Sequence, residues 1–307
     1  MRNAFIQTLS ALAADDERIW LLTGDLGYSV LEAYYERFPQ RYVNVGVAEQ
    51  NLTGLAAGLA SCGKIVFTYS IANFPTLRCL EQIRNDVCYH GLPVKVVSVG
   101  GGFAYGPQGY THHGLEDLAI LRTLPGMTVV APGDPVETDL ATRALVNLPG
   151  PCYLRLGKAR EPVVHTSPPD FALGRAIRVR DGDDLTLIST GGILAYTLAA
   201  AQRLSTEHHI EARVLSMHTL KPLDESAVHA ALRETGGIVT VEEHSVTGGL
   251  GSAVADVIAA LDGPRRPFRK FGVPDRLNHE IGSQDYLRRL GGDLVELARR
   301  LQQGART

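Results

Sequence analysis

A single glutamate, Glu49, stands where an apolar segment passes into a helical pattern. Its neighbours Val45, Val47 and Ala48 are apolar. Burial among such residues is expected to raise the pKa of a carboxyl group, which suits it to share a proton with a ligand. The alternative is a glutamate that only stabilises the start of its helix through the helix dipole.

A long glycine-rich loop carries the second set of reactive side chains. Residues 100–114 follow a strongly apolar strand pattern and contain Gln108, His112 and His113. Open α/β sheets bind ligands in loops at the carboxyl ends of their strands, and histidine exchanges protons near neutral pH. This loop is therefore predicted to form part of a binding site, with a plain surface loop as the alternative.

Aromatic and basic residues in two further strand regions complete the candidate set. Phe74 follows Tyr69 and Ile71 and offers a flat apolar surface, although core packing would also explain it. Arg155 lies in a strand pattern, and its guanidinium suits a phosphate, sulfonate or carboxylate. An ordinary ion pair at the surface is the alternative for Arg155.

The elements that position these residues alternate between β-rich runs and helical patterns, which predicts parallel βαβ units. A segment with three prolines, residues 157–172, is typical of a linker and is followed by a second series of the same kind. The chain is thus predicted to be two α/β domains with largely parallel sheets, residues 1–165 and 166–307. Predicted strands are 19–23, 64–68, 94–99, 128–130, 152–156, 185–189, 212–215, 237–241 and 267–271. Predicted helices are 48–61, 75–89, 116–124, 135–147, three that follow residues 192, 222 and 251, and 284–302.

Composition and charge exclude several classes of protein. The net charge of −3 and the lack of a clustered basic face argue against nucleic acid as a partner. A solvated turn explains the basic residues at 265, 266, 269 and 270, and no segment is typical of a membrane span or a secretory signal. Four cysteines in apolar stretches, without a C-x-x-C pair, indicate reduced core cysteines of a cytoplasmic protein: Cys62, Cys79, Cys88 and Cys152. The glycines of residues 248–251 do not have dinucleotide-binding spacing and predict a tight strand-to-helix turn.

Several segments resemble, in order and spacing, the transketolases and their relatives, which use thiamine diphosphate. The resemblance rests on Gly-Val-Ala-Glu-Gln at 46–50, on residues 68–74, on Thr-His-His at 111–113, and on residues 242–252. It covers nearly the whole chain. The first predicted domain is similar to the family's pyrimidine-binding domain and the second to its C-terminal domain.

The resemblance implies roles for individual residues. Glu49 would hydrogen-bond the aminopyrimidine ring and help the cofactor to reach the tautomer that removes the thiazolium proton. Phe74 would stack on that ring, with Ile71, Tyr69 and Asp25 also near the cofactor. His112 would contact the substrate near its reacting carbon. The remaining substrate-binding candidates are His113, Gln108, Arg155, Ser29 and Arg2.

Departures from the family pattern limit what the resemblance implies. Gln108 stands where transketolases carry an acidic residue, and an expected earlier histidine falls among Gly100–Gly102, so the usual pentose phosphate pair is not implied. The G-D-G…N motif that binds Mg²⁺ and the diphosphate is missing, and the D-G-D at 181–183 does not replace it. The resemblance therefore implies that an N-terminal transketolase subunit holds both groups, in an α2β2 complex acting on small sugar-like substrates.

Other functions stay open on the sequence alone. The β-subunit of a 2-oxoacid dehydrogenase E1 component has the same two-domain layout, although residues 111–113 and Arg155 fit the sugar enzymes better. Half of a deoxyxylulose-phosphate-synthase-like enzyme would carry the same segments at 46–50 and 68–70. A non-catalytic paralogue is a third alternative, and the presence of Glu49 argues against it.

Overall fold

Seven strands form the first sheet of the computed structural model, which describes residues 1–262 and 266–306. Six of them pair in parallel, so their carboxyl ends lie at one edge. The order is β10-β5-β6-β4-β3-β1-β2. The bounds are β1 (Ile19–Thr23), β2 (Tyr42–Asn44), β3 (Ile65–Ile71), β4 (Val94–Val99), β5 (Thr128–Val130), β6 (Cys152–Leu156) and β10 (Thr219–Lys221).

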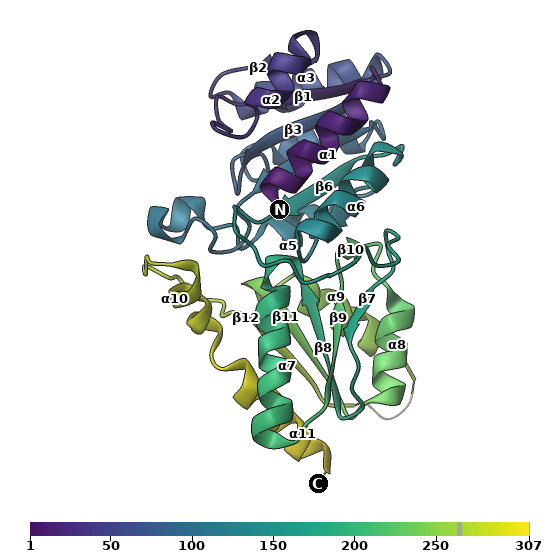
Figure 1. Cartoon of the computed structure of the whole chain (residues 1–307), viewed down its shortest axis with the longest axis vertical. Helices are drawn as coiled ribbons and strands as arrows, with labels where there is room; N and C mark the ends of the chain where they lie inside the picture. The colour runs from purple at the N-terminus through teal and green to yellow at the C-terminus, as the bar shows by residue number, and fades with distance from the viewer. Residues whose placement is uncertain (263–265, 307) are drawn as a thin grey trace.

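Helices cover both faces of this sheet, as expected for a parallel sheet with apolar strands. Helices α1 (Arg2–Asp15) and α6 (Pro135–Val146) pack together on one face (Figure 1). Helix α3 (Glu49–Ser61) contributes its buried residues to a different hydrophobic cluster, which α5 (Asp117–Thr123) shares. A short helix, α2 (Glu32–Arg37), contacts α1.

The second sheet has the order β12-β11-β8-β9-β7 and is parallel except for the edge strand β7. Helices α7 and α11 contact each other, as do α8 and α9 (Figure 1). The strands are β7 (Ile177–Arg180), β8 (Leu185–Thr190), β9 (Ala212–Ser216), β11 (Ile238–Ser245) and β12 (Phe268–Val273). The helices are α7 (Leu194–His208), α8 (Glu225–Glu234), α9 (Leu250–Ala259), α10 (Gln284–Arg288) and α11 (Leu294–Arg306).

The prediction of two largely parallel α/β sheets is confirmed, with local corrections. The predicted helix over residues 75–89 is wrong in its first part, because residues 73–79 are turns and bends that lead into α4 (Leu80–Gln82) and a π-helix, Ile83–Cys88. The last predicted helix is divided where Gly292 adopts a φ of 87°. Strands β2, β7 and β10 were missed; each has only three or four residues and lies at the edge of its sheet. Cys62 is exposed rather than in a core.

The two halves of the chain share structure across their boundary. Strand β10, from the second half, pairs antiparallel with β5 at the edge of the first sheet. One hydrophobic cluster contains Val129 and Met127 of the first half together with Met217 and Leu220 of the second. The burial of shared apolar surface fixes the halves relative to each other. The division at residue 165 stays a sequence prediction.

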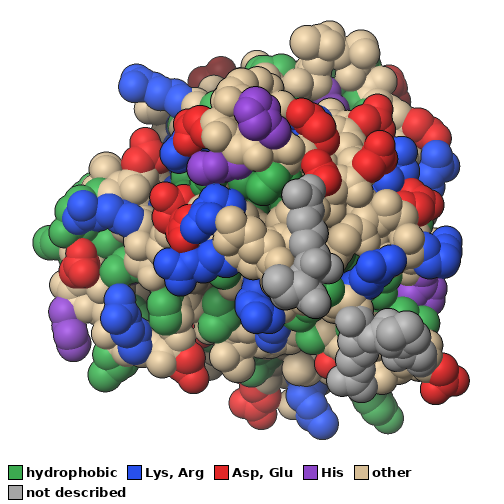
Figure 2. All heavy atoms as spheres, turned by 90° about the horizontal axis from the view of Figure 1, so that it is seen from below, with side chains coloured by type: hydrophobic (Ala, Val, Ile, Leu, Met, Phe, Trp, Pro, Cys, Tyr) green, Lys and Arg blue, Asp and Glu red, His purple; other side chains and the backbone are tan. Residues whose placement is uncertain are grey.

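The charge distribution on the surface and the character of the helices concern two classes that the sequence argued against, nucleic-acid-binding and membrane-spanning proteins. Basic and acidic side chains are interspersed over the face in Figure 2. Lys270, one of the residues assigned to a basic turn, lies in β12 and donates a hydrogen bond to Ser252 Oγ at 3.0 Å. Arg265 lies outside the described residues. Among the described helices, none has the length and apolar character needed to cross a membrane.

The glycine-rich segment at 248–251 forms the predicted strand-to-helix turn. Both oxygens of the buried Glu242 carboxylate accept hydrogen bonds from the start of α9, from Leu250 N at 2.7 Å and Gly251 N at 2.8 Å. The helix dipole favours an anion at this position. Glu242 therefore fills the place where a nucleotide phosphate would bind.

A buried polar cluster fastens the linker to both halves. Asp134 caps α6 and accepts hydrogen bonds from the backbone of Val164 and His165. Glu137 pairs with His165 Nε2 at 2.8 Å and also accepts from Ser216 Oγ of β9. The hydrogen bond to Glu137 raises the pKa of His165 above its ordinary value. Protein donors, His165 among them, occupy all the carboxylate oxygens of Asp134 and Glu137, which favours a structural role over a metal site for this cluster.

The Glu137–His165 pair predicts a pH-dependent contribution to the stability of the fold. Because the folded-state pKa of His165 is raised, the contribution is complete below the ordinary value of 6.5 and is lost as pH rises through the folded-state pKa. In His165→Gln, urea unfolding should show a deficit larger at pH 6 than at pH 9 by about 1 kcal/mol, the order of a charge-assisted hydrogen bond. His279→Gln, at an exposed histidine, is the control. An equal deficit at both pH values would contradict the assignment.

Candidate active site

The segments singled out in the sequence meet at the carboxyl edge of the first sheet. Parallel pairing places there the loops that follow β1, β2, β3, β4 and β6. Of the five described non-glycine residues with positive φ, four also lie at this edge: Asp25 (58°), Ser29 (61°), Ala72 (38°) and Arg160 (65°). Such conformations cost free energy and concentrate at functional sites.

Glu49 is the first residue of α3, and only 3% of its surface is exposed. Its Oε2 accepts a hydrogen bond from Arg78 Nη1 at 2.7 Å, and Arg78 is itself half exposed. The Arg78 guanidinium lies 5.3 Å from the centre of the Phe74 ring. Arg78 therefore compensates the buried charge, while Glu49 Oε1 has no hydrogen-bond partner among the described residues.

Aromatic contacts extend this group from Phe74 to a lysine. The Phe74 and His112 rings meet edge to face with centroids 5.2 Å apart, and Tyr105 lies 6.2 Å beyond His112. Lys158 Nζ lies 4.5 Å from the centre of the Tyr105 ring. Thr111 Oγ1 lies 3.0 Å from His112 Nδ1 and helps to hold the imidazole. The structure thus brings Glu49, Phe74 and His112 together and adds a cation.

Three other predicted residues lie around this group. Arg2 begins α1, and its charge lowers the pKa of Tyr105 against the larger effect of burial, which raises that pKa. Ser29 is exposed, and its backbone N donates to Glu32 Oε1. Asp25 is exposed and pairs with Asn44, whose side chain also accepts from Asp25 N at 2.9 Å.

The side chains of the remaining loop and strand candidates make no hydrogen bond or ring contact with Glu49, Phe74 or His112 in the described part of the chain. His113 is buried, with Nε2 3.2 Å from Gly106 O and its ring against Phe103. Tyr69 is only 2% exposed and stacks on Phe5 beneath α1, in the core. Ile71 is half-buried at the end of β3, and Gln108 is exposed.

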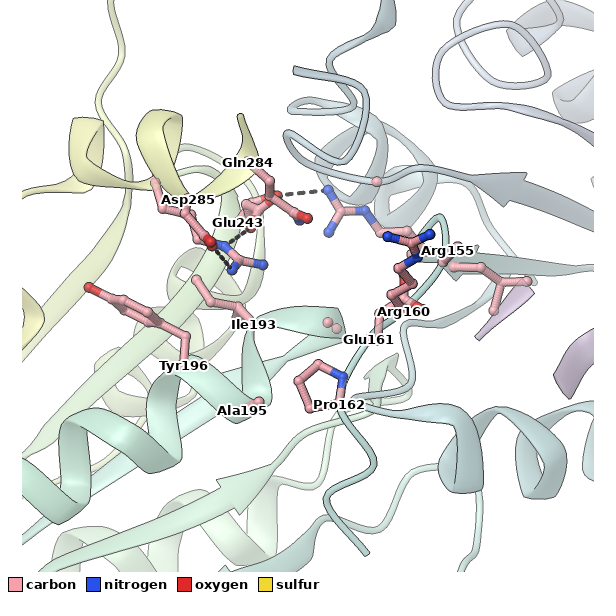
Figure 3. A pocket seen from close by; sticks show the side chains of 17 residues that line it. Arg155, Arg160, Glu161, Pro162, Ile193, Ala195, Tyr196, Glu243, Gln284 and Asp285 are labelled. Carbon is pink, nitrogen blue, oxygen red and sulfur yellow. Dashed lines mark hydrogen bonds and ion pairs between the residues drawn. The ribbon is translucent and has the colours of Figure 1, made fainter. Parts of the chain in front are cut away.

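Arg155 is a buried residue whose charge is balanced inside the protein. Its Nε lies 2.9 Å from Asp117 Oδ2, and its Nη2 donates to the backbone oxygen of Gly114. The same Nη2 donates to the backbone oxygen of Glu243, across the cavity drawn in Figure 3. The side chain also lines a cavity of about 470 Å³ between the two halves, whose lining excludes Glu49 and His112. Arg155 therefore does form an ion pair, but the pair is buried and not at the surface, where the alternative had placed it.

The second half of the chain supports the histidine loop. Glu243 Oε1 accepts hydrogen bonds from Phe103 N at 2.6 Å and from Gln284 Nε2 at 2.8 Å, and its Oε2 pairs with Arg288. A Cβ at Gly102 would clash with the Glu243 carboxylate, so only glycine permits this approach. The Phe103 side chain packs in a small core with Leu115, Val273 and Leu287.

Sequence reasoning missed Arg78, Tyr105, Lys158 and Glu243 as parts of the site. The Glu49–Arg78 pair joins residues 29 positions apart, with no local pattern to reveal it. Lys158 was assigned to a linker by composition, although it is the first charged residue after β6. That position at a strand's carboxyl end was the signal that could have identified it.

Family models agree with this arrangement. The model described as transketolase, pyrimidine binding domain, matches residues 1–162, and that of the transketolase C-terminal domain matches residues 174–291. The chain belongs to the transketolase family. Strands β1 to β6 and the site loops that follow them lie in the pyrimidine-binding domain, whereas β10, β11 and α9 lie in the C-terminal domain.

Relatives within the family include separate subunits. The chain is 42% identical to an apulose-4-phosphate transketolase subunit of Phocaeicola vulgatus, over 89% of this chain and 87% of the relative. It is 39% identical to the 6-deoxy-6-sulfo-D-fructose transketolase subunit SqwH of a Clostridium species, over 94% and 88%. A solved split-gene transketolase, an inactive β4 tetramer, superposes with a TM-score of 0.86 at 37% identity, over 99% and 97%. The 1-deoxy-D-xylulose-5-phosphate synthase 1 of Geobacter sulfurreducens is 36% identical over 96% of this chain, which spans 46% of that protein.

The support of the histidine loop by Glu243 can be tested by hydrogen exchange. In Glu243→Ala the buried Phe103 N–H loses its acceptor, so its exchange should accelerate at least about tenfold. Asp285→Asn removes only the exposed partner of Arg288 and is the control. Amides of β8 report global stability in the same experiment. Unchanged exchange at Phe103, with β8 also unchanged, would contradict the supporting role.

Proposed function

We propose that this protein is one subunit of a split transketolase, which uses thiamine diphosphate to transfer a two-carbon ketol unit between small sugar-like substrates. The observation that carries the proposal is the buried Glu49 carboxylate beside Phe74 and His112 at the carboxyl edge of the pyrimidine-binding sheet. The names of the two related proteins, each a transketolase subunit, support it.

The residues at this edge fit the aminopyrimidine part of the cofactor. Glu49 offers an oxygen that no described residue of the chain engages, and the half-buried Phe74 offers an aromatic wall. Asp25 lies two residues beyond the end of β1, and Ile71 is the last residue of the neighbouring β3, so both would border the same group. Thiamine diphosphate, when bound, supplies the nucleophilic carbon for the transfer.

Two side chains of this protein would handle protons. Glu49 would hydrogen-bond the pyrimidine nitrogen and hold a proton there, through the oxygen that no described residue of the chain engages. His112 would exchange a proton with a hydroxyl or carbonyl oxygen of the substrate, and its Nδ1 is held by Thr111. Two contacts support a shared site for these roles: the Phe74 ring meets His112, and Arg78, which binds Glu49, lies 5.3 Å from the centre of the same ring.

The anionic end of the substrate would bind near Lys158. Lys158 and Arg2 both lie close to Tyr105, and Ser29 lies in the loop after β1, at the same edge of the sheet. Two cations at the rim of a site suit phosphate or sulfonate. Arg155 offers less to this substrate, because its Nε and Nη2 are already engaged within the protein.

A partner subunit would complete the site. Large apolar side chains are exposed in the loops of the carboxyl edge or beside them, and their burial would stabilise a complex. They are Tyr28 (73% exposed), Val47 (75%), Leu77 (42%), Tyr110 (54%) and Ile281 (64%). We propose that an N-terminal transketolase subunit covers this edge in an α2β2 complex in the cytoplasm, and that it supplies the diphosphate site and the Mg²⁺ ligands.

One alternative has an observation in its favour. The similarity to a deoxyxylulose-phosphate synthase is consistent with a half-enzyme that condenses pyruvate with a sugar phosphate. The two functions differ in their products, since only the synthase-like reaction releases carbon dioxide. Assay of the assembled complex with pyruvate distinguishes them.

The role of Glu49 predicts a large kinetic effect. Glu49→Gln, assembled with the partner subunit, should lower turnover at least about 100-fold, because the acid–base assistance is lost while the shape is kept. Glu81→Gln removes an exposed carboxylate three residues after Arg78 and should leave turnover unchanged. Near wild-type turnover in Glu49→Gln would rule out the assignment.

A further inference from the structure

A cavity of about 470 Å³ lies between the two halves of the chain. One wall is the end of β6 with residues 157 and 159–162, and another is the start of α7 (Figure 3). Glu243, with Gln284 and Arg288 of α10, closes the third side. Ile193, Pro162 and Tyr196 supply apolar surface, so the cavity has room for a small organic molecule.

Most charges around the cavity are already paired. Arg288 contacts Glu243 and Asp285, and Glu161 pairs with the amino group of Met1. Arg160, which also lines the cavity, makes no ion pair or side-chain hydrogen bond among the described residues. The cavity is therefore left with one uncompensated positive charge at its mouth.

A second donor reaches the cavity from inside the protein. Arg155 is 4% exposed, and its Nε and Nη2 are bonded, but its Nη1 has no hydrogen-bond partner in the described part of the chain. A Cβ at Gly191 would lie 3.6 Å from Nη1, which places this nitrogen beside the glycine. The Arg155 side chain can take this position only because residue 101 is glycine, since a Cβ there would clash with it. Arg155 lines the cavity, so an anion bound there could supply the acceptor that no described residue provides for Nη1.

The backbone beside Arg155 Nη1 also favours an anion. Gly191–Ile193 form a 3-10 turn that runs directly into α7, a helix of 15 residues, and no described side chain caps either start. Gly191 N donates to Ala131 O, whereas Gly192 N has no partner outside the helical segment in residues 1–262 and 266–306. The first N–H groups of a helix carry partial positive charge and favour an anion.

We propose that this cavity binds a small organic anion, with a phosphate ester as the chemical class. Its phosphate would accept hydrogen bonds from Arg155 Nη1 and the backbone at Gly192, with Arg160 at the mouth and the apolar wall around Tyr196 against its carbon chain. This site is separate in its lining from Glu49, Phe74 and His112 and does not depend on transketolase activity.

Phosphorus NMR titration of glycerol 3-phosphate with the full chain tests the site. Saturable binding is expected at constant ionic strength set with chloride. Arg160→Asn should weaken binding at least about fivefold through loss of a charge-assisted contact, and asparagine tolerates the left-handed backbone at this position. Arg203→Asn makes the same charge change on the exposed part of α7 and should not alter binding.

A second variant keeps the test decisive if Arg160→Asn unfolds. Ala195→Glu places a carboxylate in the cavity on the first turn of α7 and should abolish binding. Lys158→Ala, at the proposed substrate end, should leave it unchanged. Failure of wild type to bind, full binding in Ala195→Glu, or loss of binding in Lys158→Ala would overturn the proposal.

Discussion

Parallel pairing of the strands in the first sheet is the constraint on which the site depends. It forces the chain to leave six of the seven strands at one edge, so loops distant in sequence converge there. The cost is a crowded edge where charged groups are buried and backbone conformations are unfavourable. Glu49 is balanced by Arg78, and Arg155 by Asp117, which offsets the desolvation of each charge.

The second domain gives this edge its shape. Glu243 binds the histidine loop through Phe103 N, and Arg155 reaches across to the backbone of Glu243. Strand β10 extends the first sheet from the other side. The C-terminal domain therefore positions the loop that carries His112, while the side chains around Glu49 come from the first domain. The interdomain cavity lies within the same set of contacts.

The fold was largely predictable because its signals are local. Apolar runs of five or six residues, such as β4 and β6, and the helical period of α3 and α6 each determine their own element. The short edge strands were not predicted from the sequence: β10, for example, has three residues and depends on β5 for its pairing. Helix 75–89 failed at its start, where residues 73–79 form turns despite their apolar content.

The site was predictable only in part, for a different reason. Glu49, Phe74 and His112 were identified through resemblance to a family, and the structure places them in contact or close to it. Their partners Arg78, Tyr105 and Lys158 are set by tertiary contacts between loops, which no periodicity encodes. The burial of Arg155 follows from Asp117, which lies 38 positions away.

Native mass spectrometry of the protein purified from its own cells tests the central claim most directly. The account predicts a heteromer with a second chain, with added mass for thiamine diphosphate and a divalent metal. A homo-oligomer of this chain that retains the cofactor by itself would contradict the claim that a partner subunit completes the site.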